Sequence, residues 1–256
     1  MKRTDDSDFE GKVALVTGGN SGIGKVSALE FARRGARVVI AARRKDEGLE
    51  VVDIIRSAGG VAEFVQTDIS DKRQVDATIA HTIKLFGRLD FAFNNAATLG
   101  SPAPPLHEYS QELWNDVVAV NLTGTFLCMQ AEITHMMTNG GGSIVNTASI
   151  HGMVGNPSNL AYTTSKWGVI GMTKAAAKGY GQYGIRVNAV SPGLTHTPMV
   201  ESFVNDEEHL NKALEKYPLG RVGQPKEISE AVVWLCSDSA SFITGVNLPV
   251  EGGFTA

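Results

Sequence analysis

The sequence predicts a single α/β domain built as three layers, in which a doubly wound parallel sheet is covered by helices on both faces. Two observations lead to this prediction. Short apolar runs alternate with longer segments of helical periodicity along most of the chain, and the first apolar run leads directly into a glycine-rich turn. A chain of 256 residues with 43% hydrophobic residues can bury one large core, and no repeat or interdomain linker divides it.

Six short apolar runs are the predicted strands, because each is too short for a helix and most are rich in β-branched or aromatic residues. They are Val13–Thr17, Val38–Ala42, Ala62–Gln66, Phe91–Asn94, Ile144–Thr147 and Val187–Val190. Between them lie segments with apolar residues at helical spacing, which end near glycine. These are 22–34, 45–58, 71–86, 110–138, 160–181 and 225–237. The alternation forms βαβ units, which place the strands parallel in a Rossmann-type sheet.

Three segments interrupt this alternation. Residues 1–10 predict a flexible N-terminal tail, so that the single domain spans 11–256. The loop Thr98–Leu106 is irregular because three prolines interrupt it, and 194–220 is a long insertion before the last helix. In an open parallel sheet both would follow strand carboxyl ends, where ligands bind. We therefore expect 194–220 to form a mobile lid over a substrate.

Charge and cysteine content exclude several classes of partner. The net charge is −4, with 23 basic and 27 acidic residues interspersed, which argues against nucleic acid or an anionic membrane. Cys128 and Cys236 stand alone, without the spacing of a disulfide framework or a metal site. The polar N-terminus resembles no targeting segment, and no apolar run approaches the length of a membrane span. These features predict a cytoplasmic protein that binds a small molecule and no metal.

The glycine-rich turn after Val13–Thr17 predicts a site for a nucleotide pyrophosphate. It reads Gly18-Gly19-Asn20-Ser21-Gly22-Ile23-Gly24 and opens the helix predicted at 22–34. The glycines allow a tight turn, close approach of a phosphate to backbone N–H groups and close helix packing. The phosphate would then lie at the positive end of the helix. Glycine clusters alone are often simple turns, but a strand and a helix on either side favour nucleotide binding.

The end of the second strand predicts which dinucleotide binds. Folds that take NAD usually carry an acidic residue about 20 positions after the glycines, which binds the ribose 2′-OH. Ala42 stands there instead, and Arg43 and Arg44 follow it. A guanidinium can donate two charge-assisted hydrogen bonds to a 2′-phosphate, so we expect NADP(H) to be preferred over NAD(H). Alternatively, the two arginines form a solvated surface pair.

One group of side chains predicts redox chemistry. Tyr162 precedes Lys166 by one helical turn, and Ser149 lies just after the apolar run that ends at Thr147. A phenol beside an ammonium, with a hydroxyl near the same point, can exchange a proton with a substrate oxygen. A free Tyr titrates near pKa ~10, and a neighbouring Lys⁺ would lower that pKa toward neutrality. The tyrosine-lysine spacing alone is modest evidence.

Together these motifs resemble the short-chain dehydrogenase/reductase family, in its compact branch of about 250 residues, over nearly the whole chain. The matches are Thr17-Gly18-x-x-x-Gly22-x-Gly24, Asp68-Ile69, Asn94-Asn95-Ala96, Asn121, Ser149, Tyr162-x-x-x-Lys166 and Pro192-Gly193-x-x-x-Thr197. Two positions depart from the pattern: Ala97 replaces a glycine, and Glu251 stands where aspartate is frequent. We expect Ala97 to tune the nicotinamide site and Glu251 to be structural.

The resemblance implies a role for each matched residue. Asp68 would contact the adenine ring, with Ile69 beside it, and the cofactor would also contact Asn95, Ala96 and Ala97 as well as Pro192, Gly193, Thr195 and Thr197. Tyr162 would be the general acid/base, Lys166 would also bind the nicotinamide ribose, and Ser149 would orient the substrate oxygen. Asn121 would hold a water that links Lys166 to solvent. Each has a structural alternative: a turn for Asp68, a strand-end cap for Ser149, a buried amide for Asn121 and a core residue for Tyr162.

The substrate is predicted less closely. His151, Met153, Leu194 and Met199, together with Ser149 and Tyr162, are the candidate contacts, although a lone His is often a satisfied polar residue. Apolar residues dominate near the site, which favours a small neutral carbonyl compound or secondary alcohol. The long segments 110–138 and 160–181 carry apolar surface for a homo-oligomer, and the resemblance implies a homotetramer.

Two other functions remain open. A catalytically silent nucleotide-binding regulator could share the fold, but it would have no need of Asn121, Ser149, Tyr162 and Lys166 together. A dehydratase or epimerase of the same fold is less favoured, because such relatives often have a larger C-terminal substrate region than the residues after Pro192 provide.

Overall fold

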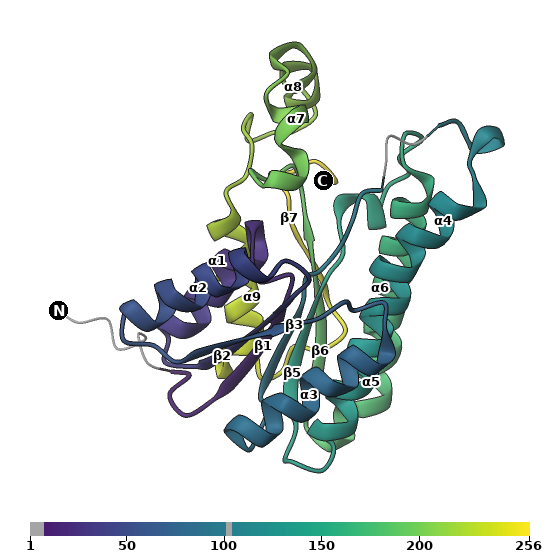
Figure 1. The fold of residues 1–256 in the computed structure, drawn as a ribbon. Coiled ribbons are helices and arrows are strands. Elements are labelled where there is room, and N and C mark those ends of the chain that lie inside the picture. The colour runs from purple at the N-terminus through teal and green to yellow at the C-terminus, as the bar shows by residue number, and fades with distance from the viewer. Residues whose placement is uncertain (1–7, 101–103) are drawn as a thin grey trace.

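A computed structural model describes residues 8–100 and 104–256 of the chain. Its centre is a seven-stranded parallel sheet with the strand order β3-β2-β1-β4-β5-β6-β7 (Figure 1). The strands are β1 Val13–Thr17, β2 Arg37–Ala42, β3 Ala62–Gln66, β4 Phe91–Asn94, β5 Gly142–Thr147, β6 Ile185–Pro192 and β7 Asn247–Val250. The order reverses direction between β1 and β4, and in such sheets the crevice at the reversal binds the ligand.

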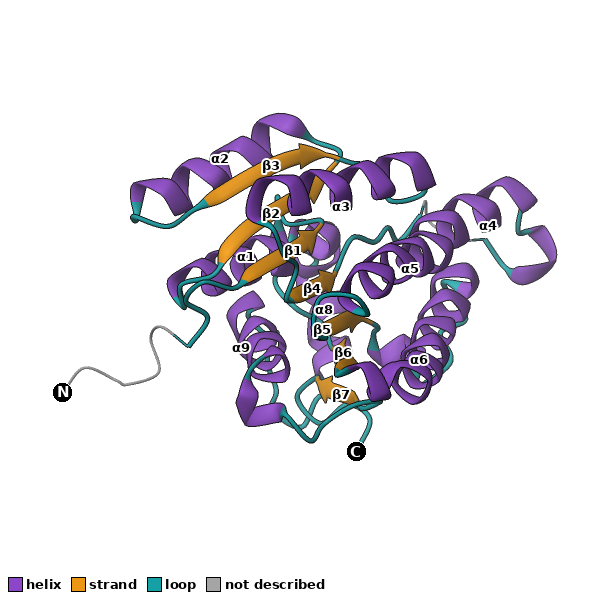
Figure 2. Cartoon of the chain, turned by 90° about the horizontal axis from the view of Figure 1, so that it is seen from below, coloured by secondary structure: helices purple, strands orange, loops and turns teal. Residues whose placement is uncertain are grey.

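Helices cover both faces of the sheet, which confirms the predicted three-layer doubly wound fold (Figure 2). One face carries α1 Gly22–Arg33, α2 Lys45–Ser57 and α9 Pro225–Cys236. The other carries α3 Lys72–Phe86, α5 Thr125–Met136 and α6 Leu160–Tyr180, with α4 Gln111–Val118 packed on α6. Four short 3₁₀ turns lie between these elements: η1 Leu106–Glu108, η3 Ile150–Gly152, η4 Gly181–Tyr183 and η6 Asp238–Ala240.

The predicted helix over 110–138 contains a wider turn. Between α4 and α5 the chain forms a π-helix, η2 Ala119–Gly124, and the helical path continues on both sides of it. A single π turn inside an α-helix is frequently found at a functional site. The stretch Gln111–Met136 is long enough to span a membrane, and an 18-residue window within it has a mean hydropathy of 1.2, but 44% of that window is buried in the fold. Its contacts with β4, β5, α3 and α6 explain the apolar character.

The predicted insertion at 194–220 contains short helices. It contains η5 Pro198–Val200, α7 Glu201–Val204 and α8 Glu207–Leu214. Figure 1 shows α7 and α8 standing beyond the end of the sheet. The proline loop predicted over 98–106 falls partly on 101–103, which lie outside the described residues.

Strand β7 is absent from the sequence prediction. Within the described sheet it pairs with β6 alone, in the register that places Pro249 beside Ser191. A proline cannot donate to a ladder, and it is tolerated in β7 because an edge strand bonds on one side only.

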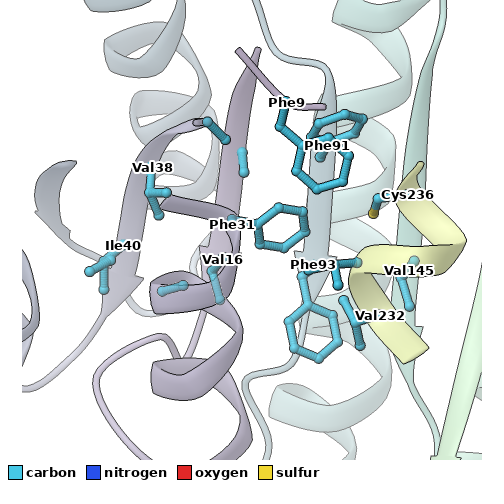
Figure 3. Close-up of a cluster of buried hydrophobic side chains, with 14 of the residues drawn as sticks. Phe9, Val16, Phe31, Val38, Ile40, Phe91, Phe93, Val145, Val232 and Cys236 are labelled. Carbon is cyan, nitrogen blue, oxygen red and sulfur yellow. The ribbon is translucent and has the colours of Figure 1, made fainter. Parts of the chain in front are cut away.

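Part of the predicted N-terminal tail belongs to the core. Residues 1–7 lie outside the described residues, but Phe9 is 2% exposed. Its ring centroid lies 4.6 Å from that of Phe91 and 5.8 Å from that of Phe31 (Figure 3). Buried aromatic residues of this size contribute strongly to the core, so the prediction of a tail as far as residue 10 is wrong at Phe9.

Candidate active site

A cleft of about 860 Å³ opens at the carboxyl ends of the strands. Most of the predicted site residues line it, from seven separate stretches of chain. These are Gly18, Asn20, Ser21, Gly22, Ile23, Arg43, Arg44, Asp68, Ile69, Asn95, Ala96, Ala97, Ser149, His151, Tyr162, Lys166, Pro192, Gly193, Leu194, Thr195, Thr197 and Met199. Gly24, Asn121 and Met153 are not among the lining residues.

The glycine-rich turn forms one wall of the cleft and fits a phosphate group. Helix α1 begins at Gly22, and the side chain of its N-cap residue, Ser21, makes no capping hydrogen bond. The first N–H groups of α1 are thus available to an anion, and no acidic residue stands in that first turn. Gly18 has φ +64°, and a Cβ there would lie 2.9 Å from the Cα of Ala96. Only glycine allows this turn to approach the loop after β4.

Gly24 packs behind the glycine-rich turn and does not line the cleft. A Cβ on Gly24 would lie 2.3 Å from the carbonyl oxygen of Gly18 and 2.6 Å from Nδ2 of Asn95. Helix α1 can therefore pack against the turn only because this position has no side chain. Gly24 shapes the turn rather than lining it.

The two arginines after β2 differ in their contacts. Arg44 is held at the phosphate turn: its Nη2 donates to Ser21 Oγ at 3.2 Å, and its Nη1 lies 3.3 Å from Oε1 of Glu47. With the Asn20 amide oriented to satisfy its hydrogen bonds, Asn20 Oδ1 also accepts from Arg44 Nη2 at 2.9 Å. The Arg43 side chain is exposed, and no described residue pairs with it. Arg43 is thus the guanidinium that remains available to a ligand.

Asp68 lines the cleft but also forms a turn. Its Oδ1 accepts from the backbone N of Ser70 at 2.9 Å and from Ser70 Oγ at 2.7 Å. The neighbouring Ile69 is buried against Val75 and Cys128. Asp68 therefore forms the turn that we considered as its structural role, and it lines the cleft as well.

The loop after β4 is tied to β1 by Thr17. Its Oγ1 accepts from the backbone N of Asn95 at 3.0 Å and of Ala96 at 3.2 Å. Asn95 Nδ2 donates back to the carbonyl oxygen of Thr17 at 3.3 Å. These bonds hold Asn95, Ala96 and Ala97 at the bottom of the cleft.

Asn121 lies in the π-helix and is fully buried. Its Oδ1 accepts from the backbone N of Thr98, and its Nδ2 donates to the carbonyl oxygen of Thr98, both at 2.8 Å. Nδ2 also donates to Ser165 Oγ at 3.3 Å. The Asn121 side chain thus holds the loop after β4, and among the described residues its hydrogen-bond partners are Thr98 and Ser165.

Ser149, Tyr162 and Lys166 come together in the cleft. Ser149 follows β5 and caps η3, where its Oγ accepts from the backbone N of His151 at 3.1 Å. Lys166 Nζ donates to the carbonyl oxygen of Thr147 at 2.7 Å and lies 5.4 Å from the centroid of the Tyr162 ring. Lys166 is 2% exposed and Tyr162 9% exposed. The Lys166 ammonium and the Tyr162 ring thus lie close to each other at the end of β5.

Burial sets the protonation of this group. It raises the pKa of Tyr162, and the hydrogen bond from Ser149 offsets part of that rise. It also lowers the pKa of Lys166 to about 7, because a charged ammonium is costly in a site without a carboxylate partner. The sequence-based expectation of a lowered Tyr162 pKa is therefore wrong: desolvation raises it.

The loop after β6 is held by contacts with residues near the C-terminal end of the 194–220 segment. Thr195 bridges Gly223, and the carbonyl oxygen of Leu194 accepts from the backbone N of Gly223 at 2.9 Å. The backbone N of Leu194 donates to the hydroxyl of Tyr217 at 3.1 Å. The stretch from Pro192 to Thr197 is thereby held along the cleft.

The open end of the cleft has apolar walls and a few polar groups. Met199 and Leu194, two of the candidate substrate contacts, line it, and His151 approaches Tyr162 edge-on, with ring centroids 6.3 Å apart. Met153 does not line it, because the η3 turn directs the chain toward β7, where Met153 Sδ accepts from Asn247 Nδ2 at 3.0 Å.

Further lining residues lie in the segments 97–106, 151–159 and 194–219, where we expected substrate contacts: Leu99, Asn156, Asn159, Val200, Phe203 and Tyr217. Phe254 also lines the cleft and lies outside these segments. Asn159 carried a usable signal, since Asn three residues before Tyr162 is a typical N-cap, and its Oδ1 accepts from Tyr162 N at 3.3 Å. Phe254 carried none, because it reaches the cleft from the last residues of the chain.

Comparison with known proteins decides the family. The family model described as "Enoyl-(Acyl carrier protein) reductase" matches residues 18–255. The chain belongs to the short-chain dehydrogenase/reductase family. The predicted resemblance is thus confirmed, and the chain is an oxidoreductase of the family that uses a nicotinamide nucleotide and acts on small molecules.

Two relatives in the short-chain dehydrogenase/reductase family act on six-membered carbon rings by name. The 2,5-dichloro-2,5-cyclohexadiene-1,4-diol dehydrogenase of Sphingobium indicum is 44% identical, over 98% of this chain and 99% of the relative. The cyclohexanol dehydrogenase of an Acinetobacter species is 40% identical over the whole of both chains.

A solved structure supports the fold. It is described as "a putative NAD(P) dependent gluconate 5-dehydrogenase" from Beutenbergia cavernae with NADP bound at low occupancy. It superposes with a TM-score of 0.91 and 34% identity, covering 98% of each chain.

Among the residues that our structure describes, no group of three or more His, Cys, Asp or Glu side chains could hold a metal ion.

Proposed function

We propose that the protein interconverts a small secondary alcohol and the corresponding carbonyl compound, with NADP(H) preferred over NAD(H). The substrate class that we favour is a neutral six-membered carbocyclic alcohol or ketone. The convergence of Ser149, Tyr162 and Lys166 in one cleft with the glycine-rich turn carries this proposal. The names of the two relatives and the apolar lining from Met199, Phe203 and Phe254 support the substrate class.

When bound, the cofactor supplies or accepts a hydride at its nicotinamide ring. Tyr162 gives a proton to the substrate oxygen in reduction and removes one in oxidation. Its raised pKa keeps the phenol protonated at neutral pH, which suits the donor role. Ser149 lies at the same point and donates a hydrogen bond that orients the substrate oxygen.

Lys166 has two proposed tasks. Its ammonium favours the phenolate of Tyr162 while the proton is away, and it binds the ribose hydroxyls of the cofactor. The bond from Lys166 Nζ to the carbonyl oxygen of Thr147 fixes the ammonium for both. We also propose that Asn121 holds a water between Lys166 and solvent, at the acceptor position of Oδ1 that Thr98 leaves open.

Arg43 would determine the cofactor preference. Its side chain lines the cleft beside Ala42 and has no partner among the described residues, whereas Arg44 is bound to Ser21 and Glu47. A 2′-phosphate beside Arg43 would accept charge-assisted hydrogen bonds. The other cofactor contacts remain as proposed: Asp68 and Ile69 at the adenine, and Asn95 to Ala97 with Pro192 to Thr197 at the nicotinamide side.

The 194–220 segment and the exposed helix faces complete the proposal. We propose that α7 and α8 close over the substrate, since Met199 and Phe203 already line the cleft from this segment. Phe126 on α5 and Trp167 on α6 are 47% and 52% exposed, which supports a homo-oligomer, and the family suggests a tetramer. Light scattering in solution measures that state.

A substrate screen tests the proposed function. Cyclohexanol, cyclohexane diols and their ketones are offered with NADP⁺ or NADPH, and the absorbance of the reduced cofactor is followed. We expect turnover with at least one ring alcohol or ketone. A silent nucleotide-binding regulator would bind NADPH without turnover of any compound, and a dehydratase or epimerase would change the substrate without net change in the reduced cofactor. Either result would contradict the proposal.

A further inference from the structure

Glu132 is a fully buried carboxyl group that the proposed mechanism does not use. It lies on the sheet side of α5, and its Oε2 accepts from Nδ2 of Asn94 at 3.0 Å. Within the described part of the chain, Glu132 Oε1 has no hydrogen-bond partner. The same is true of Oδ1 of Asn94, the other oxygen of this bonded pair. Two orphaned buried oxygens on one hydrogen-bonded pair require an explanation.

Among the described residues, the surroundings of Glu132 hold no compensating positive charge. A small cavity beside it is lined by Leu15 and Thr17 of β1, Ala41 of β2, Thr67 and Ile69 after β3, Val75, Thr78 and Ile79 of α3, and Cys128 of α5. Cys128 is the one other titratable group of this lining, and burial raises its pKa well above the ordinary value. A carboxylate without a cation here would be strongly disfavoured.

We propose that Glu132 is a neutral carboxylic acid that forms a cyclic acid–amide pair with Asn94 and thereby positions the end of β4 at the cofactor cleft. The acid O–H donates to Asn94 Oδ1, while Asn94 Nδ2 donates to the carbonyl oxygen of the acid. One proton thus gives partners to both orphaned oxygens. Independently of this geometry, burial raises the pKa of Glu132 to about 7, and the bond from Asn94 offsets part of the rise.

The pair links two parts of the site. Asn94 precedes Asn95 and Ala96, which bond to Thr17 at the bottom of the cleft. Asn94 Nδ2 also donates to Oδ1 of Asn146 in β5 at 3.0 Å. Asn146 is followed by Thr147, whose carbonyl oxygen accepts from Lys166 Nζ. Glu132 therefore acts as a positioning residue through Asn94 and touches neither substrate nor cofactor.

The pH dependence of unfolding tests the proton. The folded pKa of Glu132, about 7, lies above that of an unfolded Glu, ~4.3, so its stabilising contribution is complete below the unfolded value and is lost as pH rises through the folded one. Relative to Glu132→Gln, the folding equilibrium constant of the wild type should fall by up to about tenfold per pH unit between these values. Gln preserves both hydrogen bonds of the pair without titrating, whereas Glu132→Ala removes both.

A matched control lies in α1. Glu30 is also buried, but its pKa is lowered by hydrogen bonds from Arg33 and Arg34 despite the opposing effect of burial. Glu30→Gln should therefore lose stability at neutral pH, where Glu132→Gln should gain or retain it. A protonated-carboxyl C=O band in the infrared spectrum of the free protein at pH 6 should disappear in Glu132→Gln and persist in Glu30→Gln.

Cofactor affinity tests the positioning role, which rests on the proposed function. By fluorescence titration, NADPH binding should weaken severalfold in Glu132→Ala and be rescued in Glu132→Gln. Parallel stability curves for wild type and Glu132→Gln, together with an unchanged infrared band, would overturn the proposal. Both of these measurements need no substrate, so a failed substrate screen with the band present would reject the proposed function alone.

Discussion

Lys166 holds its ammonium nitrogen 5.4 Å from the centroid of the Tyr162 ring, one helical turn along α6. Both side chains are buried at the end of β5, and burial shifts their pKa values in opposite directions: that of Tyr162 rises, and that of Lys166 falls to about 7. Tyr162 is thus a proton donor in its resting state.

The two reaction directions should therefore depend on pH in opposite ways. Reduction needs the phenol and should be fastest at or below neutral pH. Oxidation needs the phenolate. Its rate should therefore rise by up to about tenfold per pH unit while the pH is below the pKa of Tyr162. Initial rates in both directions from about pH 6 to about pH 10 measure this. Oxidation that does not change above neutral pH would contradict the assignment of Tyr162 as the base.

Arg43→Ala should lower affinity for NADP(H) and leave affinity for NAD(H) unchanged. Hydrogen bonds to charged groups contribute about 1.5–3 kcal/mol, which corresponds to a loss of roughly 10- to 100-fold. Titration of both cofactors measures the loss. Arg73→Ala, which removes an exposed arginine outside the cleft, is the control. Equal losses for the two cofactors would contradict a contact between Arg43 and the 2′-phosphate.

Gly24→Ala should damage the phosphate turn. The new Cβ would lie 2.3 Å from the carbonyl oxygen of Gly18, so the turn or α1 must move. We expect weaker cofactor binding and a lower midpoint of unfolding. Gly179→Ala in α6 is the matched control, because its Cβ meets nothing within 4 Å and alanine favours the helix by about 1 kcal/mol. Normal cofactor binding by Gly24→Ala would show that the close packing is unnecessary.

Asn121→Leu should destabilise the loop after β4. The substitution leaves the N–H and the carbonyl oxygen of Thr98 without the partners that Asn121 provides at 2.8 Å. Each unsatisfied buried group costs about 1–3 kcal/mol, partly relieved if water enters. Chemical denaturation measures the loss, and turnover should fall with it. A variant of wild-type stability with reduced turnover would instead indicate that Asn121 serves the proton path alone.

Periodicity was sufficient to predict the layers, because buried strands and amphipathic helices leave strong patterns over many residues. Structural features that involve only a few residues leave weaker sequence patterns. The edge strand β7 is only four residues long and contains Pro249, and the π turn at Ala119–Gly124 is too short to alter the pattern of a long helix. The burial of Phe9 was not predicted, because its sequence neighbours are polar and one apolar residue forms no periodic pattern.

The site was predictable where a motif requires a particular residue and less so where the environment decides. Helical spacing placed Lys166 beside Tyr162, but spacing carries no information on desolvation, which reverses the expected shift of the Tyr162 pKa. Met153 is two residues from a lining position, yet the η3 turn directs it to Asn247. Glu132 showed no signal, because its proton depends on the packing of α5 against the sheet.

The most direct test of the central claim is turnover by Tyr162→Phe. This substitution removes one hydroxyl and keeps the ring, so cofactor affinity and the midpoint of unfolding should remain near those of the wild type. General acid/base catalysis contributes about 10²- to 10⁴-fold, and the kcat for a ring ketone or alcohol should fall by that factor. Undiminished turnover by Tyr162→Phe would contradict the account.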